Sequence, residues 1–128
     1  MLAIKSILLG LSAIWLTPNC PAVHNSKIII KIMRVTAYCS CEKCCGKYAD
    51  GITASGHRIS LGDKFIAAPK GFDFNTKIDV PGYSNEPVPV LDRGGAIKGD
   101  RLDVYFDTHQ EALNWGVKYL EVTIYDAN

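Results

Sequence analysis

The chain reads Val90-Leu-Asp-Arg-Gly-Gly-Ala-Ile-Lys-Gly-Asp-Arg-Leu-Asp-Val-Tyr-Phe106 at the point that decides its fold. On both sides of a glycine-rich loop, apolar residues alternate with other residues, and this period of two is typical of β-strands. Asp92 ends the first predicted strand, and Asp103 lies in the second, on the face opposite Leu102. Three glycines supply the backbone freedom for a tight return, namely Gly94, Gly95 and Gly99. If the two strands are neighbours, the two carboxyl groups share one cleft.

Two carboxyl groups in one cleft favour acid/base chemistry. They do not both ionise easily, so we expect one of them to keep its proton above the reference aspartate pKa of about 3.9. Cleavage of a glycosidic bond needs such an acid, because the leaving oxygen must receive a proton while a carboxylate assists the other partner. The alternative is that Asp-Arg-Gly-Gly and Gly-Asp-Arg are ordinary turn sequences with solvated charges. Spacing alone favours this alternative.

The whole segment from Leu91 to Val104 closely resembles the signature of the 3D domain, a family named for three aspartates. The resemblance covers roughly residues 34 to 125 and includes four further segments: Val35-Thr-Ala-Tyr38, Gly51-Ile-Thr-Ala-Ser-Gly56, Glu111-Ala112 and Trp115-Gly116. It implies a six-stranded double-psi β-barrel, related to the barrels of membrane-bound lytic transglycosylase A, rare lipoprotein A and expansins. The implied activity is cleavage of the glycan strands of peptidoglycan.

Carried over by this resemblance, Asp103 matches the catalytic acid/base of the family and Asp92 matches its partner. Ala68 stands in the place of the third aspartate. The expected substrate-binding residues are Tyr38, Thr53, Ser55, Arg93, Gly94, Gly95 and Lys98. Tyr38 either stacks on a sugar or belongs to the core, and Thr53 and Ser55 either bind a sugar hydroxyl or shape a turn. The cationic side chains of Arg93, Lys98 and Arg101 either meet carboxylates of the murein strand or screen the aspartates.

The mechanism that the resemblance implies is that of a lytic transglycosylase. Asp103 donates a proton to the oxygen between N-acetylmuramic acid and N-acetylglucosamine, and Asp92 and the loop amides near Gly94 and Gly95 help to orient it. Ionised Asp103 then takes the proton of the muramic C6 hydroxyl, which closes a 1,6-anhydro ring without water or a metal. Two alternatives are a non-catalytic barrel that binds cell-wall glycan, which the missing third aspartate permits, and a cysteine-rich structural or zinc-binding domain.

The first residues are expected to form a signal peptide, residues 1–22, before a single domain of residues 23–128. Lys5 precedes an apolar run from Ile7 to Leu16 that is too short to span a bilayer comfortably, and cleavage after Ala22 fits the sequence. Lipidation at Cys20, an uncleaved anchor and a buried N-terminal strand or helix are the alternatives. We therefore expect an exported protein of the periplasm, outer membrane or cell wall, with contact to the membrane only through this segment.

Four cysteines are crowded together as Cys39-Ser-Cys41-Glu-Lys-Cys44-Cys45. In an exported domain they suggest two disulfides that join Cys39 and Cys41 to Cys44 and Cys45, in an order that the sequence leaves open. A zinc site of four thiolates comes second, and a redox-active pair comes third. His109 is expected to be an exposed residue in the first turn of a helix, and His57 a loop residue. Neither is assigned to a metal, and no other cofactor is expected.

The remaining pattern predicts a mainly β protein with one short helix. Further strands are predicted over Lys27–Ala37, Lys64–Ala68, Lys77–Val80 and Tyr119–Tyr125. The helix begins at a Thr-x-x-Glu capping box at Thr108 and ends at Gly116. The 128 residues of the chain suit one domain. We expect this domain to be monomeric, with peptidoglycan as its partner. The net charge of +1 argues against a nucleic-acid-binding protein.

Overall fold

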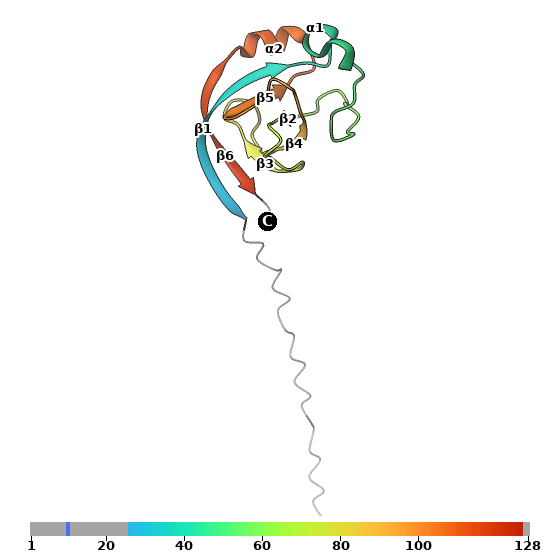
Figure 1. The fold of residues 1–128 in the computed structure, drawn as a ribbon. Helices are drawn as coiled ribbons and strands as arrows, with labels where there is room; N and C mark the ends of the chain where they lie inside the picture. The colour runs from blue at the N-terminus through green and yellow to red at the C-terminus, as the bar shows by residue number, and fades with distance from the viewer. Residues whose placement is uncertain (1–9, 11–25, 127–128) are drawn as a thin grey trace, which may run out of the picture.

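The computed structural model describes residue 10 and residues 26–126, and Figure 1 shows residues 26–126 arranged around a closed sheet. Its six strands are β1 (Lys27–Tyr38), β2 (Ile66–Ala67), β3 (Lys77–Asp79), β4 (Val88–Asp92), β5 (Arg101–Tyr105) and β6 (Lys118–Asp126). Its helices are α1 (Glu42–Cys45), the 3-10 helix η1 (Gly46–Tyr48) and α2 (His109–Trp115). The expected signal peptide, apart from residue 10, lies outside the described residues. Within these residues, no helix has the length and apolar character needed to cross a membrane.

The strands close into a ring in the order β1, β5, β2, β4, β3 and β6. β1 runs parallel to β5 and β2 runs parallel to β4, whereas the other four pairs are antiparallel. A sheet that closes on itself pairs both sides of each strand, so a small domain avoids unpaired edges. The six predicted strands are confirmed, each within two residues at either end.

The core is formed by alternate residues of the strands, as the period of two predicts. In β5, Leu102 and Val104 are completely buried, whereas Asp103 between them is only partly buried and lies on the other face. The same alternation in the other strands completes a single cluster that includes Met33, Val35, Ile66, Ile78, Val80, Val90, Val122 and Ile124. The core therefore fixes which face of β5 carries Asp103.

Helix α2 confirms the predicted capping box. The side chain of Thr108 accepts a hydrogen bond from the backbone N–H of Glu111, and the Glu111 side chain accepts one from the backbone N–H of Thr108. At the other end, Trp115 donates its indole N–H to the carbonyl of Val35 over 3.2 Å, which ties α2 to β1. The prediction of only one helix is wrong, because the cysteine segment folds into α1 and η1.

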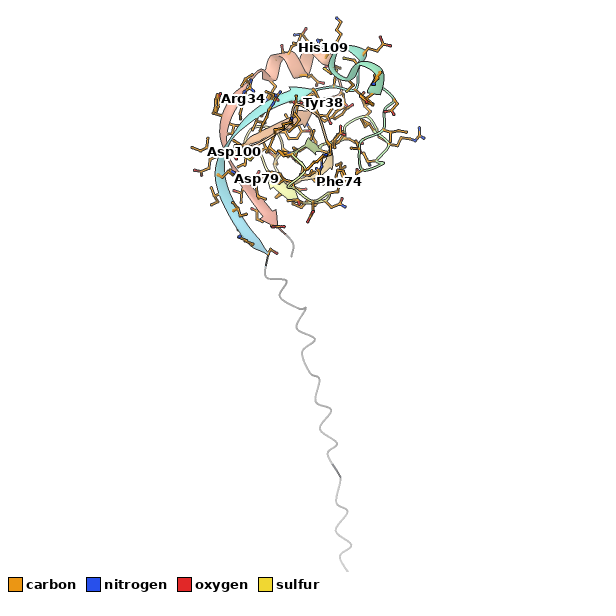
Figure 2. All side chains as sticks on the ribbon, viewed as in Figure 1. Arg34, Tyr38, Phe74, Asp79, Asp100 and His109 are labelled. Carbon is orange, nitrogen blue, oxygen red and sulfur yellow. The ribbon has the colours of Figure 1, made fainter. Side chains whose placement is uncertain are left out.

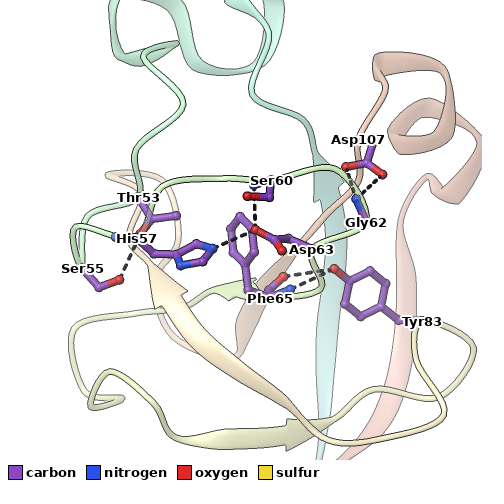
Figure 3. Close-up of polar contacts among 9 residues, drawn as sticks. All are labelled: Thr53, Ser55, His57, Ser60, Gly62, Asp63, Phe65, Tyr83 and Asp107. Atoms are coloured by element: carbon purple, nitrogen blue, oxygen red, sulfur yellow. Dashed lines mark hydrogen bonds and ion pairs between the residues drawn. The ribbon is translucent and has the colours of Figure 1, made fainter.

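Replacing Tyr83 with Phe should lower the free energy of unfolding by about 1–3 kcal/mol. The buried Tyr83 hydroxyl accepts a hydrogen bond from the backbone N–H of Phe65 over 3.2 Å and lies 2.6 Å from the carbonyl of Tyr105, to which it donates. Figure 3 shows its contacts with Phe65. Phenylalanine would leave both backbone groups unpaired in the interior. Urea denaturation measures the effect, and the exposed Tyr119 gives a control, because Tyr119→Phe should change the stability little.

Candidate functional site

Asp92 and Asp103 lie on strands that are not neighbours. β2 runs between β4 and β5, and its Ala67 is aligned with Asp92 on one side and with Asp103 on the other. Neighbouring strands are about 4.8 Å apart, so the backbones of the two aspartates are separated by roughly twice that distance. Thr36 of β1 continues the row beyond Asp103. The two carboxyl groups share one cleft across the small side chain of Ala67, and not through direct pairing of their strands.

An open groove of about 1290 Å³ contains both aspartates. Its walls come from the end of β1, from the segment between α1 and residue 54, from β2 with the residues after it, and from the chain between β4 and β5. Seven of the lining residues belong to the predicted site besides Asp103: Tyr38, Thr53, Asp92, Arg93, Gly94, Gly95 and Lys98. Ser55 does not line the groove. The fold thus brings together most of the predicted site from distant parts of the sequence.

Asp92 accepts three hydrogen bonds. Its Oδ1 accepts the backbone N–H groups of Ala54 and Arg93, each over 2.9 Å. Its Oδ2 accepts the hydroxyl of Tyr38 over 2.6 Å. A carboxylate offers about four acceptor positions, so these donors use most of them and fix the orientation of the group. Asp92 is therefore a positioned acceptor with little capacity left for another partner.

Asp103 is the carboxyl group that can hold a proton. Burial raises the pKa of Asp103 from 3.8 to about 6, while the hydrogen bond from Thr36 and the charge of Arg101 oppose the rise, and Asp92 adds the smallest contribution. The expectation that a second carboxyl group keeps the proton on the first is therefore wrong in its cause, because the main cause is the loss of water around Asp103. The chemical consequence is the same: a carboxylic acid that exchanges a proton near neutral pH.

Thr36 is a site residue that sequence reasoning missed. Its hydroxyl lies 3.0 Å from Oδ1 of Asp103 and 3.3 Å from the carbonyl of Leu102. With one proton, the hydroxyl can donate to ionised Asp103, or it can turn to Leu102 and accept from protonated Asp103. The sequence did contain a signal for Thr36, because side chains two positions apart in a strand lie on the same face, and Tyr38 was already predicted as a site residue. Loop amides near Gly94 and Gly95 were predicted to help orient Asp103, whereas among the described residues the hydrogen-bond donor to Asp103 is Thr36.

Tyr38 packs in the protein and points its hydroxyl at the site. Its ring makes edge-on contacts with Tyr105, at 5.8 Å between centroids, and with Phe65, at 6.5 Å. Burial raises the pKa of Tyr38 far above its usual value, with Asp92 as the next cause, so the hydroxyl stays protonated as a donor. Of the two interpretations from the sequence, sugar stacking and core packing, the ring contacts favour packing. The hydrogen bond from the hydroxyl to Asp92 belongs to neither interpretation. Figure 2 labels Tyr38 on the ribbon.

Thr53 and Ser55 shape a turn beside the groove. Their hydroxyl oxygens lie 3.0 Å apart, and Thr53 Oγ1 also accepts the backbone N–H of His57 over 3.1 Å (Figure 3). The His57 ring lies 2.8 Å from Asp63, which places it in a loop pair. The turn interpretation is thus the one that the contacts favour for Thr53 and Ser55.

Arg93 turns back onto the protein. Its guanidinium donates to the carbonyls of Phe72 and Asp92 and lies 4.1 Å from the centre of the Phe74 ring. Lys98 lies on the groove wall and is exposed. Lys98 is therefore a better candidate than Arg93 for meeting an anionic group of a ligand.

The groove wall includes glycines of the loop between β4 and β5 and Ala68, which directly follows β2. A Cβ at Gly94 would lie 2.9 Å from Cγ1 of Ile97, so there is no room for a side chain, whereas Gly99 has a φ of 65° that favours glycine. Gly95 shows neither constraint, so backbone freedom is not required at all three glycines. Ala68, predicted to stand in the place of the family's third aspartate, is fully buried and donates its N–H to the Asp92 carbonyl over 3.2 Å.

The four cysteines are free thiols in the structure. Cys39, Cys41 and Cys44 gather around His109, and Cys45 lies outside this group. Cys44 and Cys45 both line the groove. The prediction of His109 as an exposed residue is wrong, since it is half-buried. Its Nδ1 faces three sulfur atoms.

Comparison with known proteins identifies relatives of this site. Residues 62–126 match the family described as the 3D domain. In Bacillus subtilis (strain 168), cell wall-binding protein YocH is 36% identical over 58% of this chain and 26% of its own length. The putative cell wall shaping protein YabE is 35% identical over 73% of this chain and 23% of its own. The SPbeta prophage-derived uncharacterized protein YorM is 30% identical over 82% of this chain and 44% of its own length. The chain spans less than half the length of each.

Proposed function

Because the chain belongs to the 3D domain family, we propose that it acts on the glycan strands of peptidoglycan as a lytic transglycosylase. The names of two relatives, which refer to binding and shaping the cell wall, support the substrate. The match to the family covers Asp92 and Asp103, both of which line the groove. The same substrate places the protein outside the cytoplasm, at the cell wall.

The observation that carries the proposal is the contrast between the two aspartates. Asp103 has a pKa raised to about 6 by burial, whereas Asp92 already accepts three hydrogen bonds. A hydrolase needs a second carboxylate that either activates water or attacks the sugar itself. Asp92 is poorly suited to either task, so the chemistry falls to one carboxyl group. Intramolecular attack by a substrate hydroxyl needs only that one group.

In the proposed mechanism, Asp103 acts first as an acid and then as a base. Its proton passes to the glycosidic oxygen as the bond from the anomeric carbon of N-acetylmuramic acid breaks. The Asp103 carboxylate then accepts the proton of the C6 hydroxyl of the same sugar. The C6 oxygen forms the new bond to the anomeric carbon, which gives the 1,6-anhydro product and restores protonated Asp103 without consuming water. The hydroxyl of Thr36 can hydrogen-bond Asp103 in its protonated and in its ionised state. Tyr38 holds Asp92 in place by donating a hydrogen bond to it.

A glycan-binding protein without catalysis is the second candidate, and Ala68 favours it. The family's third aspartate is absent at this buried position on the groove wall, so any contribution of that carboxyl group to catalysis is lost. The name of the relative YocH, a cell wall-binding protein, also refers to binding. This candidate predicts that murein binds in the groove and remains uncleaved.

For the fold, we propose the double-psi β-barrel that the family resemblance implies. Two parallel strand pairs, β1 with β5 and β2 with β4, support this topology, because they occur in a sheet whose remaining pairs are antiparallel.

Mass spectrometry of murein incubated with the purified chain tests the function. The proposal expects fragments that end in 1,6-anhydro-N-acetylmuramic acid. Hydrated reducing ends would instead indicate a hydrolase, and a murein pellet that retains the protein without soluble fragments would indicate a binding protein. Either of these results would overturn the transglycosylase assignment.

The rate of cleavage should fall as the pH rises above about 6, by roughly tenfold per pH unit, because only protonated Asp103 can donate. Replacing Thr36 with Val should move this fall to higher pH, since the hydrogen bond from Thr36 lowers the pKa of Asp103. Thr123→Val, on β6 and away from the groove, is the matched control and should leave the profile unchanged. A rate that is constant from pH 5 to 8, a range around the pKa of about 6, would contradict the role of Asp103.

A further inference from the structure

Three thiols and one imidazole nitrogen converge between the end of β1, α1 and the start of α2. Nδ1 of His109 lies 3.3 Å from the sulfur of Cys44, 3.5 Å from that of Cys41 and 3.8 Å from that of Cys39. The sulfur of Cys39 lies 2.9 Å from that of Cys41 and 3.5 Å from that of Cys44. All four ligand atoms lie within 4.8 Å of one another.

Hydrogen bonding does not account for this cluster. A neutral imidazole nitrogen either donates or accepts one hydrogen bond, and a thiol is a weak donor. One Nδ1 atom therefore cannot satisfy three sulfur atoms. A tetrahedral zinc ion with Zn–S bonds of about 2.3 Å and a Zn–N bond of about 2.0 Å would separate its ligand atoms by roughly 3.6–3.8 Å. The distances from Nδ1 to the three sulfur atoms, 3.3 to 3.8 Å, and the 3.5 Å between the sulfur atoms of Cys39 and Cys44 lie close to that geometry. The 2.9 Å between the sulfur atoms of Cys39 and Cys41 is shorter, so these two side chains would move apart around the ion.

We propose that Cys39, Cys41, Cys44 and His109 bind one zinc ion. Three thiolates and one imidazole form a closed tetrahedral set, which is typical of structural zinc and leaves no position open for a substrate. The soft sulfur ligands exclude magnesium and calcium, which prefer oxygen. The site is independent of the proposed activity, because none of the four ligand atoms takes part in the proton transfer.

Cys45 does not belong to the zinc site although it directly follows Cys44. Its sulfur donates to the carbonyl of Cys39 over 3.3 Å, and its side chain lines the groove. The fourth ligand comes instead from a residue 65 positions after Cys44 in the sequence. The proposed ligand set therefore differs from the four thiolates considered from the sequence: it consists of three cysteines and one histidine that is distant in the sequence.

The zinc ion would link three separate parts of the fold. Cys39 directly follows β1, Cys44 lies in α1, and His109 is the first residue of α2. Figure 1 shows α1 beside the start of α2, and Figure 2 labels His109 there. α1 and η1 also carry Cys44, Cys45 and Tyr48 of the groove wall. Metal binding would therefore stabilise one wall of the groove, since a metal that closes a long loop restricts the unfolded chain.

The test compares two neighbouring cysteines in the full chain. After dialysis, elemental analysis should find about one zinc ion per wild-type chain. Cys44→Ser and His109→Asn should lose the metal, whereas Cys45→Ser should retain it. Cobalt added to the metal-free wild type should produce the strong near-ultraviolet absorption of cobalt–thiolate bonds, and the same absorption in Cys45→Ser keeps the test valid if Cys44→Ser fails to fold.

Two results would overturn the proposal. One is a wild-type chain without zinc whose intact mass is lower by the hydrogens that disulfide formation removes. The other is loss of zinc from Cys45→Ser to the same extent as from Cys44→Ser, since that would require a ligand set other than the one in the structure. Neither result depends on whether the chain cleaves murein.

Discussion

Replacing Asp103 with Asn should lower the rate of glycan cleavage by about 10²–10⁴-fold, the usual contribution of a positioned acid or base. Asparagine has nearly the same shape but carries no exchangeable acid proton, so both the donation to the leaving oxygen and the later uptake of the C6 proton are lost. Quantifying 1,6-anhydro ends released from murein by mass spectrometry measures the effect.

Asp100→Asn is the matched control for this variant. Asp100 lies three residues earlier, is exposed, and pairs with Lys31 outside the groove. Its replacement should leave the cleavage rate within about twofold, because exposed ion pairs contribute little. Undiminished release of anhydro ends by Asp103→Asn would refute Asp103 as the acid.

The Asp103→Asn variant should also change how the free energy of unfolding depends on pH. Because the pKa of folded Asp103 is raised to about 6 and the unfolded value is about 3.9, the folded state binds this proton more tightly. The contribution of Asp103 to stability is therefore fully present below about pH 4 and is lost as the pH rises through 6. Asp103→Asn should be less sensitive to pH across that window in urea denaturation. An unchanged pH dependence would show that Asp103 is not buried as described.

Replacing Phe65 with Ala should lower the free energy of unfolding by about 3–5 kcal/mol. Phe65 is completely buried, and its ring stacks on Tyr105 with 4.5 Å between centroids. Edge-on contacts join it to Tyr38 and to His57, at 6.5 and 5.9 Å. Alanine would remove this apolar area and leave a cavity under the site. Urea or thermal unfolding gives the measurement.

The effect of Phe65→Ala should reach the groove, because Tyr38 loses one of its aromatic supports and its hydroxyl orients Asp92. We therefore expect cleavage to fall even at temperatures where the variant remains folded. Leu61→Ala provides the comparison, since Leu61 is also apolar but 92% exposed, and it should change stability by no more than about 0.5 kcal/mol. Equal losses in both variants would contradict the packing described for Phe65.

The candidate site could be predicted in its residues but not in its arrangement. Asp103, Asp92, Tyr38 and Lys98 were selected from the sequence, and all four line the groove. The insertion of β2 between β4 and β5 was not visible in the sequence, because strand order depends on contacts between residues far apart in the chain. His109 was missed as a partner of the cysteines for the same reason, since it lies 65 to 70 positions away from them.

The sequence by itself determined the elements: six strands, the capped helix α2, and the face of β5 that carries Asp103. These follow from local rules, since side chains alternate along a strand and a capping box acts within four residues. Only the tertiary structure decided that Ala67 separates the two aspartates and that burial, more than Asp92, raises the pKa of Asp103. The physical reason is that exclusion of water from a side chain depends on every segment packed around it, and those segments are distant in the sequence.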